Sequence, residues 1–242
     1  MRPTIICHMS TSIDGRLHPS RFTRAAAGIS WDVLRSHYEK VHDSFEADGW
    51  IIGRRTANEM AKGSERNIAD APKLPRETHV GERGGRKLAV TIDPSGRVHY
   101  GKDNIGGDHV VAVIGAQVSD AYLAELRDDG VSHIFAGAHG DDLPGAMEQL
   151  AAHSGARKLL LEGGGRINGA FLKHGLIDEF STLIYPGVDG VRGSDSIVDY
   201  AGPEGDRPGA GQTLRLIHCE ALEGGMVSVS YTHLTLPTNR EV

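Results

Sequence analysis

A buried strand that runs directly into three glycines is the feature that most restricts the fold of this chain. Leu159–Leu161 form a short apolar run, Glu162 follows, and Gly163–Gly165 come next. The segment 167–174 then has the pattern of a short helix, with Gly175 as its stop signal. The glycines therefore occupy a strand-to-helix corner, where backbone N–H groups and the helix dipole favour a bound anion. An ordinary tight turn is the alternative interpretation.

The same order of strand and helix recurs along the chain. Strands are expected at 4–9, 49–52, 87–92, 110–114, 131–136, 159–161 and 180–185, and helices at 31–47, 57–62, 120–128, 144–153 and 167–174. Ser30 is a candidate N-cap for the first helix. Two late runs, 213–219 and 226–231, are joined by a glycine-containing turn, which indicates an antiparallel hairpin. The pattern predicts an α/β fold with a mostly parallel central sheet, flanked by helices and closed by this hairpin.

A chain of 242 residues is long enough for one domain with a substantial core. We expect residues 1–231 to form that domain. Residues 232–242 continue neither the strand alternation nor a helical pattern. We therefore expect a non-native or disordered tail there, with no functional role.

Composition argues against several classes of partner. The net charge is −6 and aromatic residues make up 5% of the chain, so nucleic acid is not an expected partner. No apolar segment approaches the roughly 20 residues that span a bilayer, and no membrane partner is expected. Met1–Ser10 lack the apolar core of a signal peptide. Because Cys7 and Cys219 are the only cysteines, we expect a cytoplasmic protein.

Several common site motifs are missing from the sequence. The Gly163 corner resembles the G-x-G-x-x-G dinucleotide fingerprint, but Asn168 stands at the last glycine, and no acidic residue ends a strand about 20 residues further on. There is no Walker A motif, and no G-x-S-x-G motif of a serine hydrolase. The 13 histidines are scattered without H-E-x-x-H or C-x-x-C spacing, so no metal site is expected.

A second glycine corner carries two cations. Gly53 ends an apolar run and is followed by Arg54, Arg55 and Thr56. Guanidinium groups at a helix start suit a pyrophosphate and the 2′-phosphate that distinguishes NADP from NAD. The alternative is that either arginine simply lies on the surface.

Two carboxylates are candidate reactive groups. Glu162 ends its strand, so it either faces a ligand beyond the strand or caps the N–H of Gly165. Asp14 lies in the segment Ser12–Gly15, where it either contributes to a site or stabilises a turn.

The two glycine corners together resemble the NADPH-binding corners of the dihydrofolate reductase-like superfamily. Within it, three motifs are most similar to the riboflavin-biosynthesis pyrimidine reductases: Ser12-Ile13-Asp14-Gly15-Arg16, Ile92-Asp93-Pro94-Ser95-Gly96-Arg97, and Leu161-Glu162-Gly163-Gly164-Gly165 with Gly175-Leu176-Ile177-Asp178-Glu179. The resemblance extends over roughly residues 3 to 231. It implies a dihydrofolate reductase-like fold and NADPH-dependent reduction of 5-amino-6-(5-phosphoribosylamino)uracil to the ribitylamino product, with hydride passing to C1′ of the sugar.

The resemblance also implies roles for individual residues. The cofactor-binding set is Ser10, Thr11, Gly53, Arg54, Arg55, Thr56, Ser95, Gly163, Gly164, Gly165, Arg166 and Ile167. Of these, the 54–56 segment and Ser95 would bind the adenosine end, and Ser10 and Thr11 would border the nicotinamide. The helix start at 164–170 would hold the pyrophosphate, and a cis peptide would join Gly163 and Gly164. Glu162 would face a phosphorylated small-molecule substrate, and the protein would be a homodimer with the late hairpin at its interface.

Glu162 and Asp14 are the candidate catalytic residues, because either carboxyl group can orient or protonate the substrate. The helix after Thr56 carries Asn58, Glu59 and Met60 where the pyrimidine reductases usually have an acidic residue. The zinc deaminase domain often fused to such reductases is missing, so a separate deaminase or another substrate is expected. The alternatives are a reductase of another small imine or pteridine, and a catalytically silent NADP-binding module.

Overall fold

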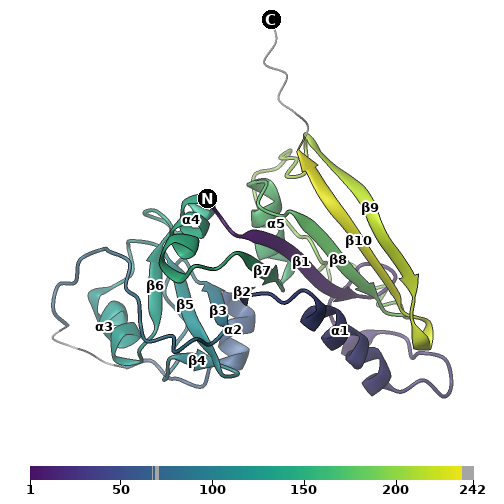
Figure 1. Ribbon diagram of the computed structural model, residues 1–242, viewed down its shortest axis with the longest axis horizontal. Coiled ribbons are helices and arrows are strands. Elements are labelled where there is room, and N and C mark those ends of the chain that lie inside the picture. The colour runs from purple at the N-terminus through teal and green to yellow at the C-terminus, as the bar shows by residue number, and fades with distance from the viewer. Residues whose placement is uncertain (67, 69–70, 236–242) are drawn as a thin grey trace, which may run out of the picture. The chain divides into compact units, whose positions relative to one another are not determined.

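The computed structural model describes residues 1–66, 68 and 71–235, which contain five α-helices and ten β-strands (Figure 1). The chain divides into two compact units. Unit 1 contains residues 1–3 and 47–159, and unit 2 contains residues 4–46 and the chain from residue 160 onward. Strand β7 (Lys158–Leu161) crosses the boundary between them in sequence. That residues 1–231 act as one reductase domain stays a prediction.

Unit 1 alternates strands and helices. Its elements are β2 (Gly49–Gly53), α2 (Arg54–Met60), β3 (Leu88–Ile92), β4 (Asn104–Ile105), β5 (Asp108–Ile114), α3 (Asp120–Asp128), β6 (Ser132–Phe135) and α4 (Leu143–Ser154). Strands β2, β3, β5 and β6 pair in parallel in that order, and the short β4 pairs antiparallel with the start of β5. Parallel strands joined through helices are buried on both faces, and all five residues of β3 are buried.

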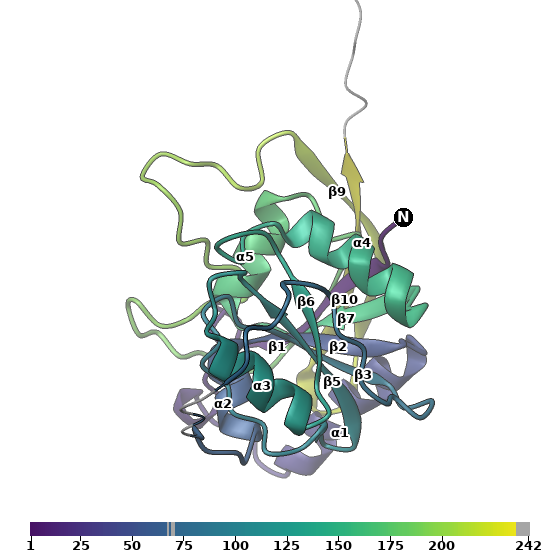
Figure 2. The same cartoon turned by 90° about the vertical axis from the view of Figure 1, so that its left-hand side faces the viewer.

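Two helices cover the sheet of unit 1. Alternate residues of β5 point to opposite faces of the sheet. Val110 and Ala112 pack into one apolar cluster with Leu123 and Leu126 of α3. Val111, between them, lines a small cavity together with residues of α4. Helices α3 and α4 therefore pack on opposite faces, and Figure 2 shows both beside β5 and β6.

Unit 2 combines a parallel strand pair with an antiparallel hairpin. Its elements are β1 (Thr4–Thr11), the short 3-10 helix η1 (Pro19–Arg21), α1 (Trp31–Ser44), α5 (Gly165–Lys173), β8 (Glu179–Ile184), β9 (Gln212–Ala221), the turn η2 (Glu223–Gly225) and β10 (Val227–Thr235). Strand β1 pairs in parallel with β8, and β10 pairs antiparallel with both β8 and β9. These strands run side by side in Figure 1. The predicted α/β class, the mostly parallel pairing and the C-terminal hairpin are confirmed.

Local signals in the sequence account for the element ends. The Ser30 hydroxyl accepts a hydrogen bond from the Val33 N–H, so the predicted N-cap of α1 is confirmed. Helices α2 and α5 begin two or more residues before their predicted starts, at Arg54 and Gly165. The reason is that Gly53 and Gly164 have extended backbones and act as N-caps, so helical geometry begins directly after each glycine.

The last strand is longer than predicted. We expected it to end at Tyr231, but β10 continues to Thr235. Its backbone remains paired with β9 as far as Gln212, so ladder hydrogen bonds extend the strand beyond the apolar alternation. Residues 236–242, most of the predicted tail, lie outside the described residues. Among the described residues, no helix is long and apolar enough to cross a membrane.

Candidate functional site

The glycine corner of unit 2 joins β7 to α5. Its Gly163–Gly164 peptide bond is cis, as the family resemblance implies. Gly163 has a φ of +90°, and a Cβ there would lie 3.0 Å from the Met9 side chain. A Cβ on Gly165 would lie 2.1 Å from the carbonyl oxygen of Ser196, whereas one on Gly164 would meet nothing within 4 Å. Gly163 and Gly165 thus fit close packing, and Gly164 faces open space.

The start of α5 has no side-chain cap. Gly164 is its N-cap, and no side-chain hydrogen bond to this helix start is found within the described residues. The first backbone N–H groups of a helix need an external partner, and an anion supplies one. Asn168 in the same helix is buried and donates from its amide to the carbonyl of Ile197, at 2.7 Å. The residue that departs from the dinucleotide fingerprint thus ties α5 to the segment after residue 194.

Glu162 is held at the carboxyl end of β7 by helix α1. The Tyr38 hydroxyl donates to Glu162 Oε1 at 3.0 Å, and His42 Nε2 lies 3.6 Å from the same oxygen. The Glu162 side chain is 19% exposed. Burial raises the pKa of the Glu162 carboxyl, while the nearby His42 and the hydrogen bond from Tyr38 act in the opposite direction. This arrangement keeps a proton available on Glu162 at higher pH than on a solvated glutamate.

His8 of β1 packs against the Tyr38 ring that contacts Glu162. Its ring stacks on the Tyr38 ring with centroids 4.4 Å apart, and its Nδ1 lies 3.1 Å from the Ser181 hydroxyl. Burial lowers the pKa of His8 to about 4, so its ring is neutral at physiological pH. A neutral ring in van der Waals contact fixes the Tyr38 ring without adding charge beside Glu162.

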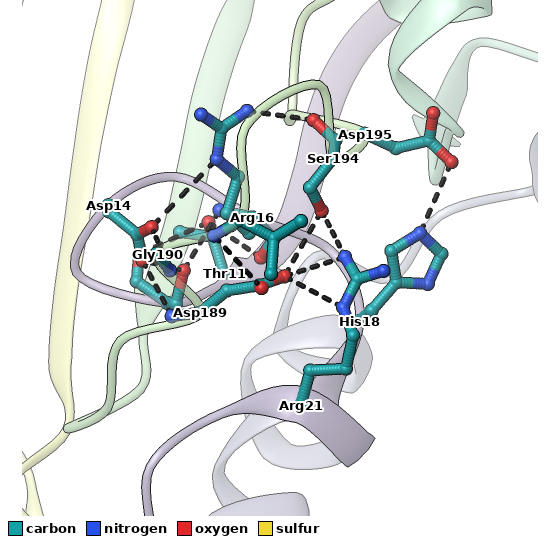
Figure 3. Close-up of polar contacts among 11 residues, drawn as sticks. Thr11, Asp14, Arg16, His18, Arg21, Asp189, Gly190, Ser194 and Asp195 are labelled. Carbon is teal, nitrogen blue, oxygen red and sulfur yellow. Dashed lines mark hydrogen bonds and ion pairs between the residues drawn. The ribbon is translucent and has the colours of Figure 1, made fainter.

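Asp14 is engaged in a loop-to-loop network instead (Figure 3). Its carboxylate accepts hydrogen bonds from the Ser12 hydroxyl at 2.7 Å and from the backbone N–H groups of Asp189 and Gly190 at 3.0 and 2.9 Å. The hydrogen bond from Ser12 and those two N–H groups lower its pKa to about 2. Asp14 therefore has a structural role in these contacts, which is one of the two interpretations that its sequence left open.

The same network joins the two loops at a second point. Arg21 donates through Nε and Nη2 to one oxygen of Asp189, at 3.1 and 2.7 Å, and Nη2 also contacts the Ser194 hydroxyl. Arg16 donates to the Ser194 carbonyl at 2.7 Å. Figure 3 shows the two arginines converging on the 189–194 segment. The loops after β1 and β8 are therefore fixed to each other within unit 2.

Ser10 and Thr11, the residues expected beside the nicotinamide, end strand β1. Thr11 is buried, and its hydroxyl donates to the carbonyls of Ser12 and Arg16. Ser10 is half-buried and pairs with Leu183 of β8. The Thr11 side chain therefore stabilises the turn that follows the strand.

The remaining predicted residues belong to unit 1. Arg54 and Arg55 are exposed in the first turn of α2, Thr56 is half-buried beside them, and Gly53 precedes the helix. Ser95 is exposed in the turn after β3, where the Gly96 N–H donates to the Asp93 carbonyl at 3.0 Å.

A cavity of about 430 Å³ lies beside the turn that contains Ser95. Its lining includes Gly96 and two cationic side chains, Arg66 and Arg97. Buried Asp93 accepts from the backbone N–H groups of Arg97 and Val98, so the turn that presents Arg97 is internally fixed. The lining also contains Glu65 and Glu125, and Arg66 is paired with Asp129 at 2.8 Å, so acidic and basic side chains share this cavity.

The site residues predicted from the sequence are thus divided between the two units. Unit 2 brings Glu162 together with Gly163, Gly164, Gly165, Arg166 and Ile167, and it also holds Ser10, Thr11 and Asp14. Unit 1 holds Gly53, Arg54, Arg55, Thr56 and Ser95. The uncapped helix start and the open space at Gly164 fit a cofactor pyrophosphate. Within the described parts of the chain, no group of three or more potential metal ligands is found.

Sequence reasoning missed Tyr38, His42 and His8. Tyr38 belongs to the apolar stripe predicted for the helix 31–47, a position typical of packing. The ring does pack against a core cluster, but its hydroxyl reaches Glu162. One signal was present, because Tyr38 and His42 are four residues apart and so lie on the same face of the helix.

Comparison with known proteins identifies the family. A model of the RibD C-terminal domain family matches residues 3–228 of the chain. The chain belongs to this family. It is 28% identical over 207 residues to the 2,5-diamino-6-ribosylamino-4(3H)-pyrimidinone 5′-phosphate reductase of Methanothermobacter thermautotrophicus, covering 84% of this chain and 86% of that protein.

Solved structures share the fold. A pyrimidine reductase-like protein from Corynebacterium diphtheriae superposes with a TM-score of 0.66 at 18% identity, over 96% of this chain and 92% of that one. RibD of Acinetobacter baumannii gives a TM-score of 0.59 at 18% identity, over 96% of this chain and 58% of the longer RibD chain. The riboflavin biosynthesis reductase Rib7 of Saccharomyces cerevisiae gives a TM-score of 0.52 at 16% identity, over 96% of this chain and 90% of that one. These likenesses confirm the predicted fold family.

Proposed function

We propose that the chain is an NADPH-dependent pyrimidine reductase of riboflavin biosynthesis. The observation that carries this proposal is Glu162, a largely buried carboxyl group at the end of β7, next to the uncapped glycine start of α5. Membership of the RibD C-terminal domain family and the reductase from Methanothermobacter thermautotrophicus support the reaction class. Arg54, Arg55 and Thr56 support NADPH over NADH, because guanidinium groups bind a 2′-phosphate well.

The ribose ring opens first: the C1′–O4′ bond breaks, O4′ takes up the proton of the N–H group, and a C1′=N imine forms. The reduction then adds a hydride to C1′ and a proton to the imine nitrogen, which gives the open ribityl chain. NADPH supplies the hydride when it is bound. The backbone N–H groups at the start of α5 hold the pyrophosphate, and Ser10 borders the nicotinamide. Glu162 faces the substrate, where its raised pKa allows it to donate a hydrogen bond or a proton toward the sugar and its nitrogen. Placement of the two reacting carbons supplies much of the rate.

Two substrates are consistent with this chemistry. The family resemblance favours 5-amino-6-(5-phosphoribosylamino)uracil, in which C2 of the ring carries an oxygen. The archaeal relative is named for the compound with an amino group at that position. The bond that is reduced is the same in both, so the ring substituent decides which compound binds. A reductase of another small imine and a silent NADP-binding module are the competing functions.

Absorbance of NADPH in the presence of each pyrimidine tests the proposal directly. We expect oxidation of NADPH with at least one of the two compounds, and slower turnover when NADH replaces NADPH. The variant Glu162→Gln keeps the shape of the side chain but cannot donate a proton from an acid group, so we expect kcat to fall by about a hundredfold. Glu223→Gln, at an exposed position in the same unit, is the matched control. Tight NADPH binding without oxidation would favour the silent module.

The proposal extends to assembly and location. A homodimer is supported by strand β9, all of whose residues after Gln212 are exposed, including Leu214, Leu216 and Ile217. A cytoplasmic location is supported by Cys7 and Cys219, which are both free thiols.

A further inference from the structure

The contacts around Glu162 reach beyond the carboxyl group that the proposed function uses. Both Tyr38 and His42 approach Glu162 from one turn of α1, and both approach the same oxygen, Oε1. No hydrogen bond or ion pair to Oε2 is found among the described residues. Helix α1 therefore engages one oxygen of the carboxyl group and makes no polar contact with the other.

The Tyr38 hydroxyl is placed by two further contacts. Its ring stacks on His8, and the hydroxyl lies 3.5 Å from the carbonyl oxygen of His8 as well as 3.0 Å from Glu162. His8 is itself fixed by the Ser181 hydroxyl of β8 and by an edge contact with the Phe45 ring, with centroids 5.6 Å apart. A side chain locked by packing on one side holds its hydrogen-bond partner in one orientation.

His42 lies between two carboxyl groups. Its Nε2 faces Glu162, and its Nδ1 lies 3.0 Å from the Asp43 carboxylate. The electrostatic effect of His42 lowers the pKa of the Glu162 carboxyl, against the effect of burial. The other titratable groups nearby are Tyr38 and buried Cys7, beside Tyr38, and His8, whose ring centroid lies 6.3 Å from that of His42.

We propose that Tyr38 and His42 are positioning residues for the reduction, holding Glu162 by Oε1 so that Oε2 faces the substrate. The proposal rests on the proposed function, in which Glu162 acts on the substrate. It goes further because it gives helix α1 a role in the reaction, although this helix contains neither the glycine corner nor the cationic corner. Removing either contact leaves Oε1 with a single partner and makes the carboxyl group easier to protonate.

Two variants separate positioning from general support of the fold. Tyr38→Phe removes only the hydroxyl and keeps the ring that stacks on His8. We expect kcat to fall roughly tenfold, since the carboxyl group that acts on the substrate loses a hydrogen bond that orients it, with KM for NADPH unchanged. In His42→Gln and Tyr38→Phe alike, the pH limb of kcat that reports Glu162 moves to higher pH, because each variant loses an interaction that favours the carboxylate.

The matched control is Tyr200→Phe. Tyr200 also donates a 3.0 Å hydrogen bond to a carboxylate, that of Asp206, in the same unit. This variant loses the same chemical group without touching Glu162, so wild-type kcat and an unshifted pH profile are expected. A merely structural role for Tyr38 would lower the melting temperature of Tyr38→Phe and leave its pH profile in place, and that result would overturn the proposal.

A second measurement keeps this test independent of turnover. Isotope-edited infrared or NMR titration of labelled glutamate follows Glu162 in the unliganded protein, with Glu162→Gln to assign its signal. Turnover by the wild type, with an unshifted Glu162 titration and unchanged kcat in both α1 variants, would overturn the inference alone. A wild type that oxidises NADPH with neither pyrimidine would overturn the proposed function and the reductive role of α1, even where the titration shifts.

Discussion

At the scale of single residues, the surroundings of two acidic side chains in unit 2 shift their pKa values in opposite directions. Glu162 is largely buried, and its carboxyl pKa is raised. Asp14 accepts from a hydroxyl and two backbone N–H groups, and its pKa falls to about 2. A carboxyl group with a raised pKa suits proton donation, while one with a lowered pKa stays ionised and holds structure. The two environments therefore favour Glu162 as the reactive group.

The lowered pKa of Asp14 predicts a pH-dependent contribution to stability. Its ionised form is favoured by folding, so the contribution is present above about pH 4 and is lost as the pH falls through about 2. In Asp14→Asn, an amide replaces one of the oxygens that accept from Asp189 and Gly190, so a backbone donor loses its acceptor. We expect a lower melting temperature at pH 7 and a smaller difference from wild type near pH 2. Thermal unfolding followed by circular dichroism measures both.

The control for this prediction is Glu204→Gln at an exposed position of the same unit. It should unfold like the wild type at every pH. Equal melting temperatures for Asp14→Asn and wild type at pH 7 would remove the structural role of Asp14 and restore its candidacy as a catalytic residue.

At the scale of elements, the corner between β7 and α5 assigns different work to adjacent glycines. Gly165 allows a close backbone approach, because the carbonyl of Ser196 lies where a Cβ would be. The Asp199 N–H also donates a hydrogen bond to the Gly165 carbonyl at 2.9 Å. Gly164 has a φ of −68°, open to any residue, and no neighbour within 4 Å of a Cβ. Packing thus accounts for a glycine at 165 but leaves Gly164 unexplained, unless a ligand occupies the space.

Alanine at each position separates these roles. Gly165→Ala forces the Ser196 backbone to move, and we expect a loss of about 1–3 kcal/mol in the free energy of unfolding. Gly164→Ala should leave stability equal or slightly higher, but its methyl group enters the space proposed for the pyrophosphate, so we expect NADPH affinity to fall roughly tenfold or more. Chemical denaturation and NADPH fluorescence titration measure the two effects. Unchanged NADPH affinity in Gly164→Ala would place the pyrophosphate elsewhere.

The strands and helices were largely readable from the sequence because their signals are local. Apolar periodicity indicated the helix at 31–47, Ser30 marked its start, and the prediction 120–128 matches α3 (Asp120–Asp128). The two-residue strand β4 was missed, since Asn104–Ile105 is too short to show alternation. The β10 extension was missed because backbone pairing with β9, rather than side-chain pattern, continues it.

The site was readable only where a motif carries it. Glycines and a following arginine identify the two corners, but the partners of Glu162 come from a helix more than a hundred residues away in sequence, and only folding brings Tyr38 to it. Its apolar spacing hid that role, because an aromatic ring in a core stripe is usually there for packing. The role of Asp14 was undecidable for the same reason, since its partners at 189 and 190 are remote.

At the scale of the whole molecule, the two units carry different parts of the proposed reaction. Unit 1 supplies the cationic corner at Arg54 and Arg55, and unit 2 supplies the glycine corner and Glu162. Strand β9 of unit 2 lies at the edge of the sheet, because among the described strands it pairs only with β10. An edge strand that exposes apolar side chains is a candidate surface for association with another protein chain.

The exposed side chains of β9 predict self-association of the whole protein. Leu214 and Leu216, two residues apart on the strand, are 53% and 54% exposed, and Ile217 at the register shift is 48% exposed. Burial of such side chains against a second copy stabilises a dimer by about 1.5–3 kcal/mol for each one fully buried. Sedimentation equilibrium should show a dimer for the wild type, and Leu216→Glu should weaken it at least tenfold, or roughly 1.4 kcal/mol. Val191→Glu, at a 46% exposed loop position of unit 2, should leave the dimer intact. A wild type that sediments as a monomer at all concentrations would instead make β9 a surface for another protein or a solvated edge.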